Sequence, residues 1–376
     1  MSKRSVVALM LSMFVITTSM GIANPVVPLY AKELGATYTD LGLIGVAWSA
    51  PYCLFPILAG LWSDRVGRLK VFFVGALMSL VVPLLLSASK SPLDIALVRL
   101  FHGVGLSFLW VTGEALISDV TREEERIRHM GLFNASWAMG YFIGPIISAS
   151  TIERVGYVGI FWTSFYVGLA SPVMLLLARE EIRPIRSTRG DVAGRVREAL
   201  SRGSAFYLAA IASSIVASII YSIYPAYLRE LRFTDSEVSV IIGVVAAARV
   251  AGFWSTTVIS GFSEKRAVYL GLSLQVVASF IVISARDLTS AALAVAMAGY
   301  AIGVLAPASA SAISKTLGRE SGLPLGIMES MFGVGWVVGP GVAGILADYT
   351  SWSLSPYLFM ALVSMATLAF FVTRSR

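Results

Sequence analysis

Residues 60–70 read GLWSDRVGRLK and stand between two apolar runs, each long enough to cross a lipid bilayer. Gly67 allows the backbone to turn sharply, and Gly60 lets a neighbouring helix approach closely. Asp64 is an acid surrounded by cations, so its carboxylate needs a basic partner or the N-terminus of a helix. The stretch therefore predicts a tight polar turn between two membrane-spanning helices.

The composition places the chain in lipid rather than in water. Of its 376 residues, 57% are hydrophobic and 14% are charged, whereas soluble domains have roughly 45–50% and about 25%. The lone cysteine, Cys53, cannot form an intramolecular disulfide, and two histidines are too few for a four-ligand zinc site. We expect an integral membrane protein that holds no metal and no other cofactor.

Twelve apolar stretches predict twelve transmembrane helices, because a spanning helix needs about 20 apolar residues. The strands of a membrane barrel would instead alternate in hydropathy over about 10 residues. The predicted fold class is all-α, with backbone hydrogen bonds satisfied inside each span. The expected spans are 6–29, 39–60, 70–88, 92–117, 129–149, 156–177, 205–227, 236–260, 266–284, 288–313, 323–347 and 353–373.

Two pairs of motifs recur at nearly constant offsets and predict an internal repeat. PLYAKEL at 28–34 resembles PAYLREL at 225–231, and G-x-x-x-G-P occurs at 140–145 and again at 335–340. The offsets are 197 and 195 residues. A cleaved signal peptide has no reason to repeat, so we interpret 6–29 as a span. The second motif is expected to pack helices through Gly140, Gly144, Pro145, Gly335, Gly339 and Pro340.

The repeat predicts two six-helix bundles in parallel tandem. We expect an N-terminal bundle over 1–178, a cytoplasmic linker over 179–204 and a C-terminal bundle over 205–376. The linker carries seven arginines and four acids. It is either a short helix lying on the membrane surface or a solvated tether.

The distribution of basic residues predicts the orientation. With the N-terminus inside, twenty-one of the 29 lysines and arginines fall on the cytoplasmic side and six on the other, while Arg99 and Arg249 lie within spans. This asymmetry favours cytoplasmic N- and C-termini in the cell membrane. The positive charge is spread over short loops and forms no single basic face, so we expect no nucleic-acid partner.

The loop at 60–70 resembles the motif G-x-x-x-D-R-x-G-R-x-K of the major facilitator superfamily of secondary transporters. Gly60, Asp64, Arg65, Gly67 and Arg68 all match it, as does the final lysine. The resemblance implies that Asp64 caps a helix of the other half. It also implies that Arg68 pairs with an acid at the end of the fourth span, here Asp119, and so locks the cytoplasmic side. The corresponding loop of the second half is shortened and lacks this pattern.

Two further stretches resemble motifs of the same family. Arg99-x-x-His102-Gly103 is similar to its R-x-x-Q-G motif, with histidine in place of glutamine, which implies that Arg99 lies by a proton or substrate site. The alternative is a structural ion pair between Arg99 and Asp94. The sequence at 140–149 resembles a motif of antiporters, although Ser148 and Ala149 replace its last two glycines.

Polar residues inside the spans are the remaining candidates for function. Glu329 either exchanges a proton while Arg249 holds or releases it, or forms with Arg249 a static pair that orients the helices. The chain has two asparagines and one glutamine, which disfavours a sugar. Hydroxyl and aromatic groups suit an amphipathic solute, or they serve as helix contacts; the candidates are Asn24, Ser214, Ser218, Tyr221 and Tyr224.

These observations predict a secondary transporter that alternates access by rocking two halves around a midplane site. Proton-coupled efflux of a small amphipathic compound is the favoured function, with a small-molecule substrate, protons and the lipid bilayer as partners and a monomeric state. Uptake or facilitated diffusion of a small metabolite or organic anion is the alternative, and a receptor or scaffold without transport is a distant one. No catalytic or nucleotide-binding motif is recognisable, so we expect no enzyme.

Overall fold

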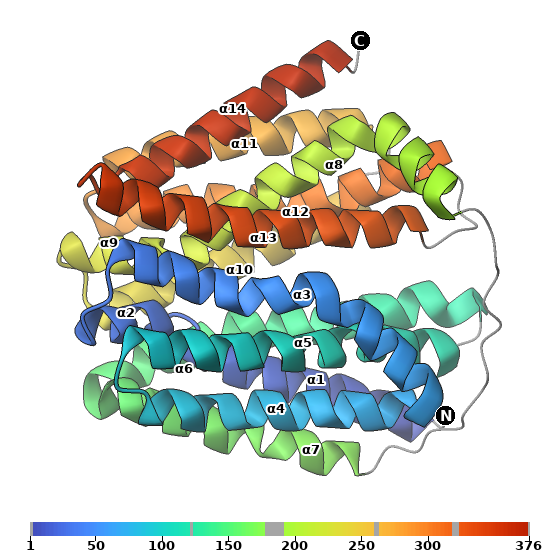
Figure 1. Cartoon of the computed structure of the whole chain (residues 1–376), viewed down its shortest axis with the longest axis horizontal. Coiled ribbons are helices and arrows are strands. Elements are labelled where there is room, and N and C mark those ends of the chain that lie inside the picture. Colours follow the sequence, from blue (N-terminus) through green and yellow to red (C-terminus); the bar gives the residue numbers. More distant parts are fainter. Residues whose placement is uncertain (1–2, 121–122, 177–191, 259–262, 318–322, 375–376) are drawn as a thin grey trace. The chain divides into compact units, whose positions relative to one another are not determined.

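The computed structural model describes residues 3–120, 123–176, 192–258, 263–317 and 323–374, and within these ranges all regular structure is α-helical (Figure 1). Its helices follow one another without any strand in the described part of the chain. They are α1 (Lys3–Ala23), α2 (Val26–Glu33), α3 (Tyr38–Val66), α4 (Arg68–Ala88), α5 (Pro92–Val120), α6 (Glu123–Gly168), α7 (Ala170–Leu175), α8 (Val192–Ser222), α9 (Tyr224–Glu230), α10 (Asp235–Val258), α11 (Glu264–Ser284), α12 (Leu288–Leu317), α13 (Leu323–Tyr349) and α14 (Ser355–Arg374).

The number of membrane crossings agrees with the prediction once two irregular segments are counted. Among the described residues, ten helical segments are long and apolar enough to cross a membrane, and the bent pair Tyr38–Cys53 and Leu58–Val66 makes an eleventh. One of the ten, His129–Leu175, is 47 residues long and would measure about 70 Å as a single helix, more than twice the apolar thickness of a bilayer. It is interrupted at Gly156, where φ is 65°, and so contains two crossings.

Contacts between residues divide the chain into two compact units. Unit 1 is Met1–Ala36, Ala47–Ser187 and Thr234–Gly243, and unit 2 is Thr37–Val46, Thr188–Phe233 and Val244–Arg376. The first turns of α3 thus belong to unit 2, and the first turns of α10 belong to unit 1. The greater part of the predicted linker, residues 179–191, lies outside the described residues; residues 192–204 are the beginning of α8.

Close crossing of α1 and α6 organises the core of unit 1. A methyl group added at Gly140 would overlap the Thr17 hydroxyl and the Phe14 carbonyl oxygen, and one added at Gly144 would overlap the backbone of Gly21. Beside this pair, α4 and α5 run next to each other (Figure 1). Large apolar side chains, among them Phe72 and Leu109, fill the space between these helices.

Unit 2 repeats the same helix pairing. Gly335 and Gly339 on α13 pack against the hydroxyls of Ser214 and Ser218 on α8, where an added methyl group would overlap them. The G-x-x-x-G-P motifs therefore pack against α1 in one unit and against α8 in the other. This geometry places these glycines at helix–helix contacts.

The first span of each repeat is broken near its end. Between α1 and α2, Asn24 and Pro25 form a turn, and Pro25 has no N–H to donate to the preceding helical turn. Between α8 and α9 the break lies at Ile223, with Pro225 at the start of the new helix. A proline thus stands at the start of the short second helix in both repeats, although Pro25 precedes the repeated sequence at 28–34 and Pro225 is the first residue of its second copy.

Carboxylates cap the N-termini of α3 and α10 at equivalent places. Asp348 of α13 accepts hydrogen bonds from the backbone N–H groups of Tyr38 (3.1 Å) and Thr39 (2.6 Å) within unit 2. Glu153 of α6 accepts one from the N–H of Ser236 at 3.3 Å within unit 1. A carboxylate favours a helix N-terminus because free N–H groups and the helix dipole attract negative charge.

The Gly140 contact makes a prediction about stability. Gly140→Ala should lower the free energy of unfolding by about 1–3 kcal/mol, because the added methyl group overpacks the α1–α6 crossing. The control is Gly131→Ala on the same helix, where an added methyl group meets nothing within 4 Å and helix propensity should raise stability by up to about 1 kcal/mol. Unfolding of both purified variants in detergent measures the difference. Equal stability of the two variants would contradict the close crossing.

Candidate functional site

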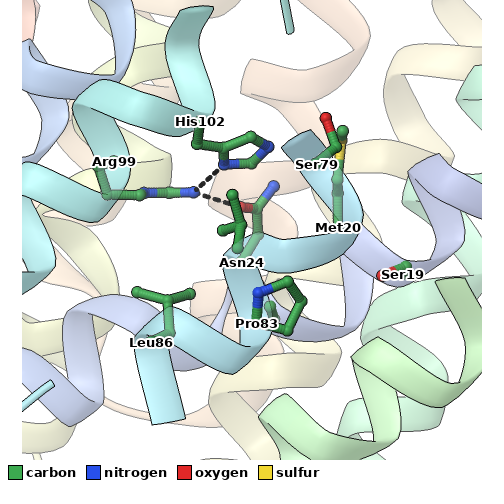
Figure 2. Close-up of a pocket in the computed structure, with 10 residues that line it drawn as sticks. Ser19, Met20, Asn24, Ser79, Pro83, Leu86, Arg99 and His102 are labelled. Atoms are coloured by element: carbon green, nitrogen blue, oxygen red, sulfur yellow. Dashed lines mark hydrogen bonds between the residues drawn. The ribbon is translucent and has the colours of Figure 1, made fainter. Parts of the chain in front are cut away.

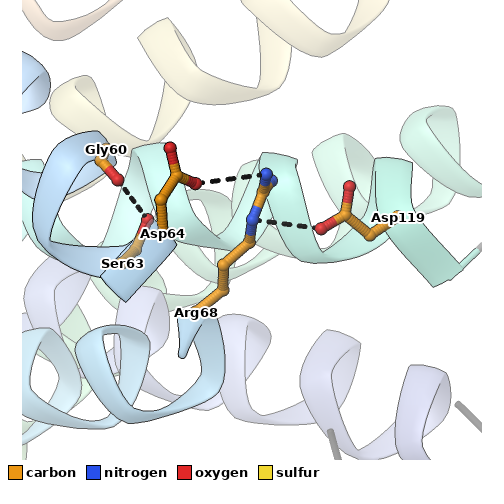
Figure 3. Close-up of polar contacts among 5 residues, drawn as sticks. All are labelled: Gly60, Ser63, Asp64, Arg68 and Asp119. Carbon is orange, nitrogen blue, oxygen red and sulfur yellow. Dashed lines mark hydrogen bonds and ion pairs between the residues drawn. The ribbon is translucent and has the colours of Figure 1, made fainter. Parts of the chain in front are cut away.

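The predicted turn between α3 and α4 forms a small ionic cluster (Figure 3). The Nε of Arg68 lies 3.0 Å from Oδ2 of Asp119 at the end of α5, and its Nη2 lies 3.5 Å from Oδ1 of Asp64. Gly67 separates the helices with φ 104° and ψ 135°, a conformation that residues with a side chain rarely adopt. The structure thus brings Arg68 and Asp119 together across 51 residues of sequence.

Two other residues of this loop, Gly60 and Arg65, lie outside the ionic cluster. We expected Gly60 to allow a close helix approach, but nothing lies within 4 Å of a methyl group added there, so this prediction is wrong. Its carbonyl oxygen instead accepts a hydrogen bond from the Ser63 hydroxyl at 2.8 Å. Arg65 is exposed, unlike Arg68, whose side chain is 12% exposed.

A second polar cluster lies in unit 1 around Arg99 (Figure 2). Arg99 Nη1 donates to Oδ1 of Asn24 at 3.2 Å and lies 3.2 Å from Nδ1 of His102. Its guanidinium carbon is 5.6 Å from the centre of the Trp48 ring, within the range of a cation–π contact. Asn24 is available to Arg99 because it sits at the break between α1 and α2. The Arg99 cluster, as we call these four residues, therefore joins α3 and α5 to that break.

The alternative assignment of Arg99 to an ion pair with Asp94 does not fit this geometry. Asp94 accepts hydrogen bonds from the backbone N–H groups of Lys90 and Ser91, both at 2.9 Å, and so caps the start of α5. Arg99 lies on the same helix more than a turn later and is directed to Asn24 and His102. The cation is thus held by neutral partners inside unit 1.

In unit 2, Arg249 of α10 lies near an acid and an aromatic pair. It is within electrostatic range of Glu329 on α13 and of Tyr221 on α8. The Tyr221 ring stacks on Trp336, with centroids 6.1 Å apart and planes inclined by 23°. Tyr221 and Arg249 are half-buried, and Glu329 is exposed. This group offers one cation, one carboxylate and a flat aromatic surface.

Three residues predicted as candidates for substrate binding lie in buried contacts between helices and not beside Arg249. Ser214 and Ser218 are 2% and 0% exposed, and their hydroxyls donate to carbonyl oxygens of their own helix while packing against Gly335 and Gly339. Tyr224 is also fully buried, with its ring 5.5 Å from that of Tyr357. These three residues serve helix packing, which corrects the prediction that they face a solute.

Sequence reasoning missed Trp336, although the repeat offsets contain a signal for it. Adding 195 to Tyr141, an electrostatic neighbour of Arg99, gives Trp336, and adding 197 to Asn24 gives Tyr221. The residues around Arg99 in unit 1 and those around Arg249 in unit 2 thus lie at equivalent positions of the repeats. Among the described residues, no set of three or more histidine, cysteine or acidic side chains could hold a metal ion.

Comparison with known proteins identifies the family. A sequence profile described as the Major Facilitator Superfamily matches residues 9–298 and, in an overlapping second match, residues 206–376. The chain belongs to the major facilitator superfamily. It is a membrane-embedded transporter and not an enzyme.

Several relatives are named for drug resistance. Multidrug resistance protein 1 of Bacillus subtilis is 24% identical over 346 residues, with 90% of this chain and 89% of the relative covered. The quinolone resistance protein NorA of Staphylococcus aureus is 21% identical over 355 residues, with 92% and 90% covered. The chain is thus similar over nearly its whole length to bacterial proteins that are named for resistance to drugs.

Solved structures show the same fold at lower identity. The nucleoside transporter NupG superposes with a TM-score of 0.82 at 11% identity, covering 98% of this chain and 99% of that one. A bacterial homologue of the human lysosomal transporter Spinster gives 0.69 at 16% identity, with 99% and 96% covered. At these identities the likeness concerns the fold alone.

The ionic cluster of the α3–α4 turn leads to a prediction about coupling between residues. In a double-mutant cycle, Arg68→Gln and Asp119→Asn should show a coupling energy of up to about 1 kcal/mol, since the pair is partly exposed to water. The matched control pairs Arg65→Gln with Asp119→Asn and should show none. Thermal unfolding in detergent supplies the four values of each cycle. Equal coupling for both arginines would contradict a specific Arg68–Asp119 contact.

Proposed function

We propose that this transporter exports a small amphipathic compound from the cell in exchange for protons. The observation that carries the proposal is the group in unit 2, where an exposed carboxylate, Glu329, lies within electrostatic range of Arg249, and Arg249 lies within the same range of Tyr221 in the Tyr221–Trp336 stack. The names of the relatives, which refer to multidrug and quinolone resistance, support efflux.

The aromatic pair supports an amphipathic substrate. Stacked rings offer a flat apolar face that accepts aromatic or lipophilic molecules without demanding a fixed set of hydrogen bonds. An ionised Glu329, about two turns before Trp336 on α13, would attract a positively charged head group. Together, the two features favour lipophilic compounds with a cationic end.

The same carboxylate supports proton coupling. A carboxyl group is neutral when protonated and is attracted to Arg249 when ionised, so proton binding changes the forces between α10 and α13. A proton and a cationic substrate that compete for one carboxylate would be exchanged rather than carried together. Glu329 is therefore the proposed coupling residue, and Arg249 the residue that responds to its charge.

The remaining predicted roles belong to the same proposal. The Arg68–Asp119 pair and Asp64 would lock the cytoplasmic side in one state of the cycle. The chain would work as a monomer in the cell membrane with both termini in the cytoplasm, since twenty-one basic residues gather on that side.

Uptake or facilitated diffusion of an organic anion is the second candidate function. It is favoured by the two cations within spans, Arg99 and Arg249, which could bind a carboxylate or phosphate group. A receptor or scaffold that binds ligand without transport is a more distant candidate, which intramembrane charges on three helices disfavour.

Transport by Glu329→Gln distinguishes these candidates. In proteoliposomes with an imposed pH gradient, the native protein should accumulate a fluorescent lipophilic cation and move protons in the opposite direction. The variant resembles the permanently protonated side chain, so it should lose gradient-driven accumulation. It should also exchange labelled for unlabelled cation more slowly than the native protein, because the carboxylate that attracts the head group is absent. The control is Glu33→Gln, which changes an exposed acid at the end of α2 and should leave both activities intact.

Three other outcomes would overturn the proposal in different ways. Gradient-driven accumulation that survives Glu329→Gln would exclude this residue as the coupling site. Equilibration of an organic anion without proton movement would favour the second candidate. Binding without flux under any gradient would favour the receptor.

A further inference from the structure

A small cavity in unit 1 adjoins the Arg99 cluster and contains polar atoms without partners. Its volume is about 10 Å³, and it is lined by the end of α1, by α4 and by α5 (Figure 2). Among the described residues, Arg99 Nε, His102 Nε2 and Ser79 Oγ are buried and have no hydrogen-bond partner. His102 and Ser79 are each only 2% exposed. Buried polar atoms normally form a hydrogen bond with the protein, with an ordered water molecule or with a ligand.

Hydrogen-bond chemistry fixes the form of His102. An arginine side chain can only donate hydrogen bonds, so the contact of 3.2 Å between Arg99 Nη1 and His102 Nδ1 requires Nδ1 to accept. The imidazole is then neutral and carries its proton on Nε2. Of the unpartnered atoms, His102 Nε2 and Arg99 Nε are therefore donors.

The opposite wall of the cavity supplies acceptors. Pro83 lies inside α4 and has no N–H, so the carbonyl oxygen of Ser79, one turn earlier, lacks its usual helical donor. The Ser79 hydroxyl is also without a partner and can donate or accept. Both Ser79 and Pro83 line the cavity.

A ligand between these walls must accept a hydrogen bond from His102 Nε2 and also donate one to an oxygen of Ser79. A metal ion is excluded by the N–H donor of His102, and a halide ion could not donate to the Ser79 carbonyl group. A water molecule meets both demands, and the volume is close to the smallest that can hold one. The chemistry and the size of the cavity therefore agree on the same ligand.

We propose that this cavity is a binding site for one water molecule, held by His102 Nε2 and the oxygens of Ser79. The water completes the hydrogen bonds of His102 in its neutral form, and Nδ1 thereby keeps Arg99 directed toward Asn24. A proton on Nδ1 and the Arg99–His102 hydrogen bond exclude each other, because both require the same lone pair. Among the described residues, Tyr141 of α6 is a further ionisable group within electrostatic range of Arg99.

Nitrogen NMR of histidine tests the proposal directly, because the chain contains only His102 and His129. In protein labelled with ¹⁵N-histidine and held in lipid nanodiscs, His102 should show a protonated Nε2 and an unprotonated Nδ1. A cross-peak should connect the Nε2 proton to water. Spectra of His102→Gln and His129→Gln assign the two signals. The measurement needs no gradient and no substrate, so its result is independent of the proposed function.

Two variants remove different partners of the water. Ser79→Ala deletes the hydroxyl group, and Pro83→Ala restores an N–H that can occupy the Ser79 carbonyl oxygen. Each should weaken the water cross-peak at least twofold. The control is Ser87→Ala on the same helix, whose hydroxyl group donates to the Leu84 carbonyl oxygen and does not line the cavity; it should leave the spectrum unchanged.

Other results would overturn the proposal. A His102 that carries its proton on Nδ1, or a native spectrum without a water cross-peak, would exclude the site. Loss of the cross-peak together with a shift of the His102 signals on adding an organic carboxylate would show that the cavity binds a solute oxygen instead. Spectra of Ser79→Ala and Pro83→Ala identical to the native one would show that the water is held by other groups.

Discussion

The interior of a bilayer offers no water to satisfy a polar group, and this constraint decides where the chain can interrupt a helix or place a charge. The junction of α1 and α2 shows how one departure supplies the partner for another. Asn24 lies at the break that precedes Pro25, and its side-chain oxygen accepts a hydrogen bond from Arg99. A helix break in the first span thus holds a cation of α5 inside unit 1.

The second consequence of the constraint is that helices pack through small residues. Because lipid is as apolar as leucine, helix association in a membrane depends on close contact and on hydrogen bonds between helices. Glycines of α6 and α13 allow this contact with α1 and α8, and each pairing positions one of the polar groups. Asp348 and Glu153 cap α3 and α10 at sites related by the same two offsets, 195 and 197 residues, that relate the motifs. The repeat is therefore present in the contacts between helices as well as in the amino-acid sequence.

Much of this architecture could be predicted because membrane spans and tight turns depend on local sequence. Length and hydropathy define the helices, and the family motif led from Arg68 to Asp119. Which side of a helix faces which neighbour depends on helices far away in the chain. Ser214 and Ser218 share a face with Tyr221, yet the glycines of α13 cover the two serines and leave Tyr221 half-buried. The misplacement of Ser214, Ser218, Tyr224 and Gly60 has this single cause.

The central claim is that the charges within the spans face water or polar groups of the protein and not lipid. Reactivity of single cysteines tests it directly in a Cys53→Ala background, since the chain has no other cysteine. Tyr221→Cys lies beside Arg249, whereas Leu362→Cys replaces a side chain that is 64% exposed on the apolar helix α14. In proteoliposomes, a small hydrophilic thiol reagent should modify Tyr221→Cys at least tenfold faster than Leu362→Cys. Equal and slow modification of both would place Arg249 and Tyr221 in an anhydrous environment and contradict the account.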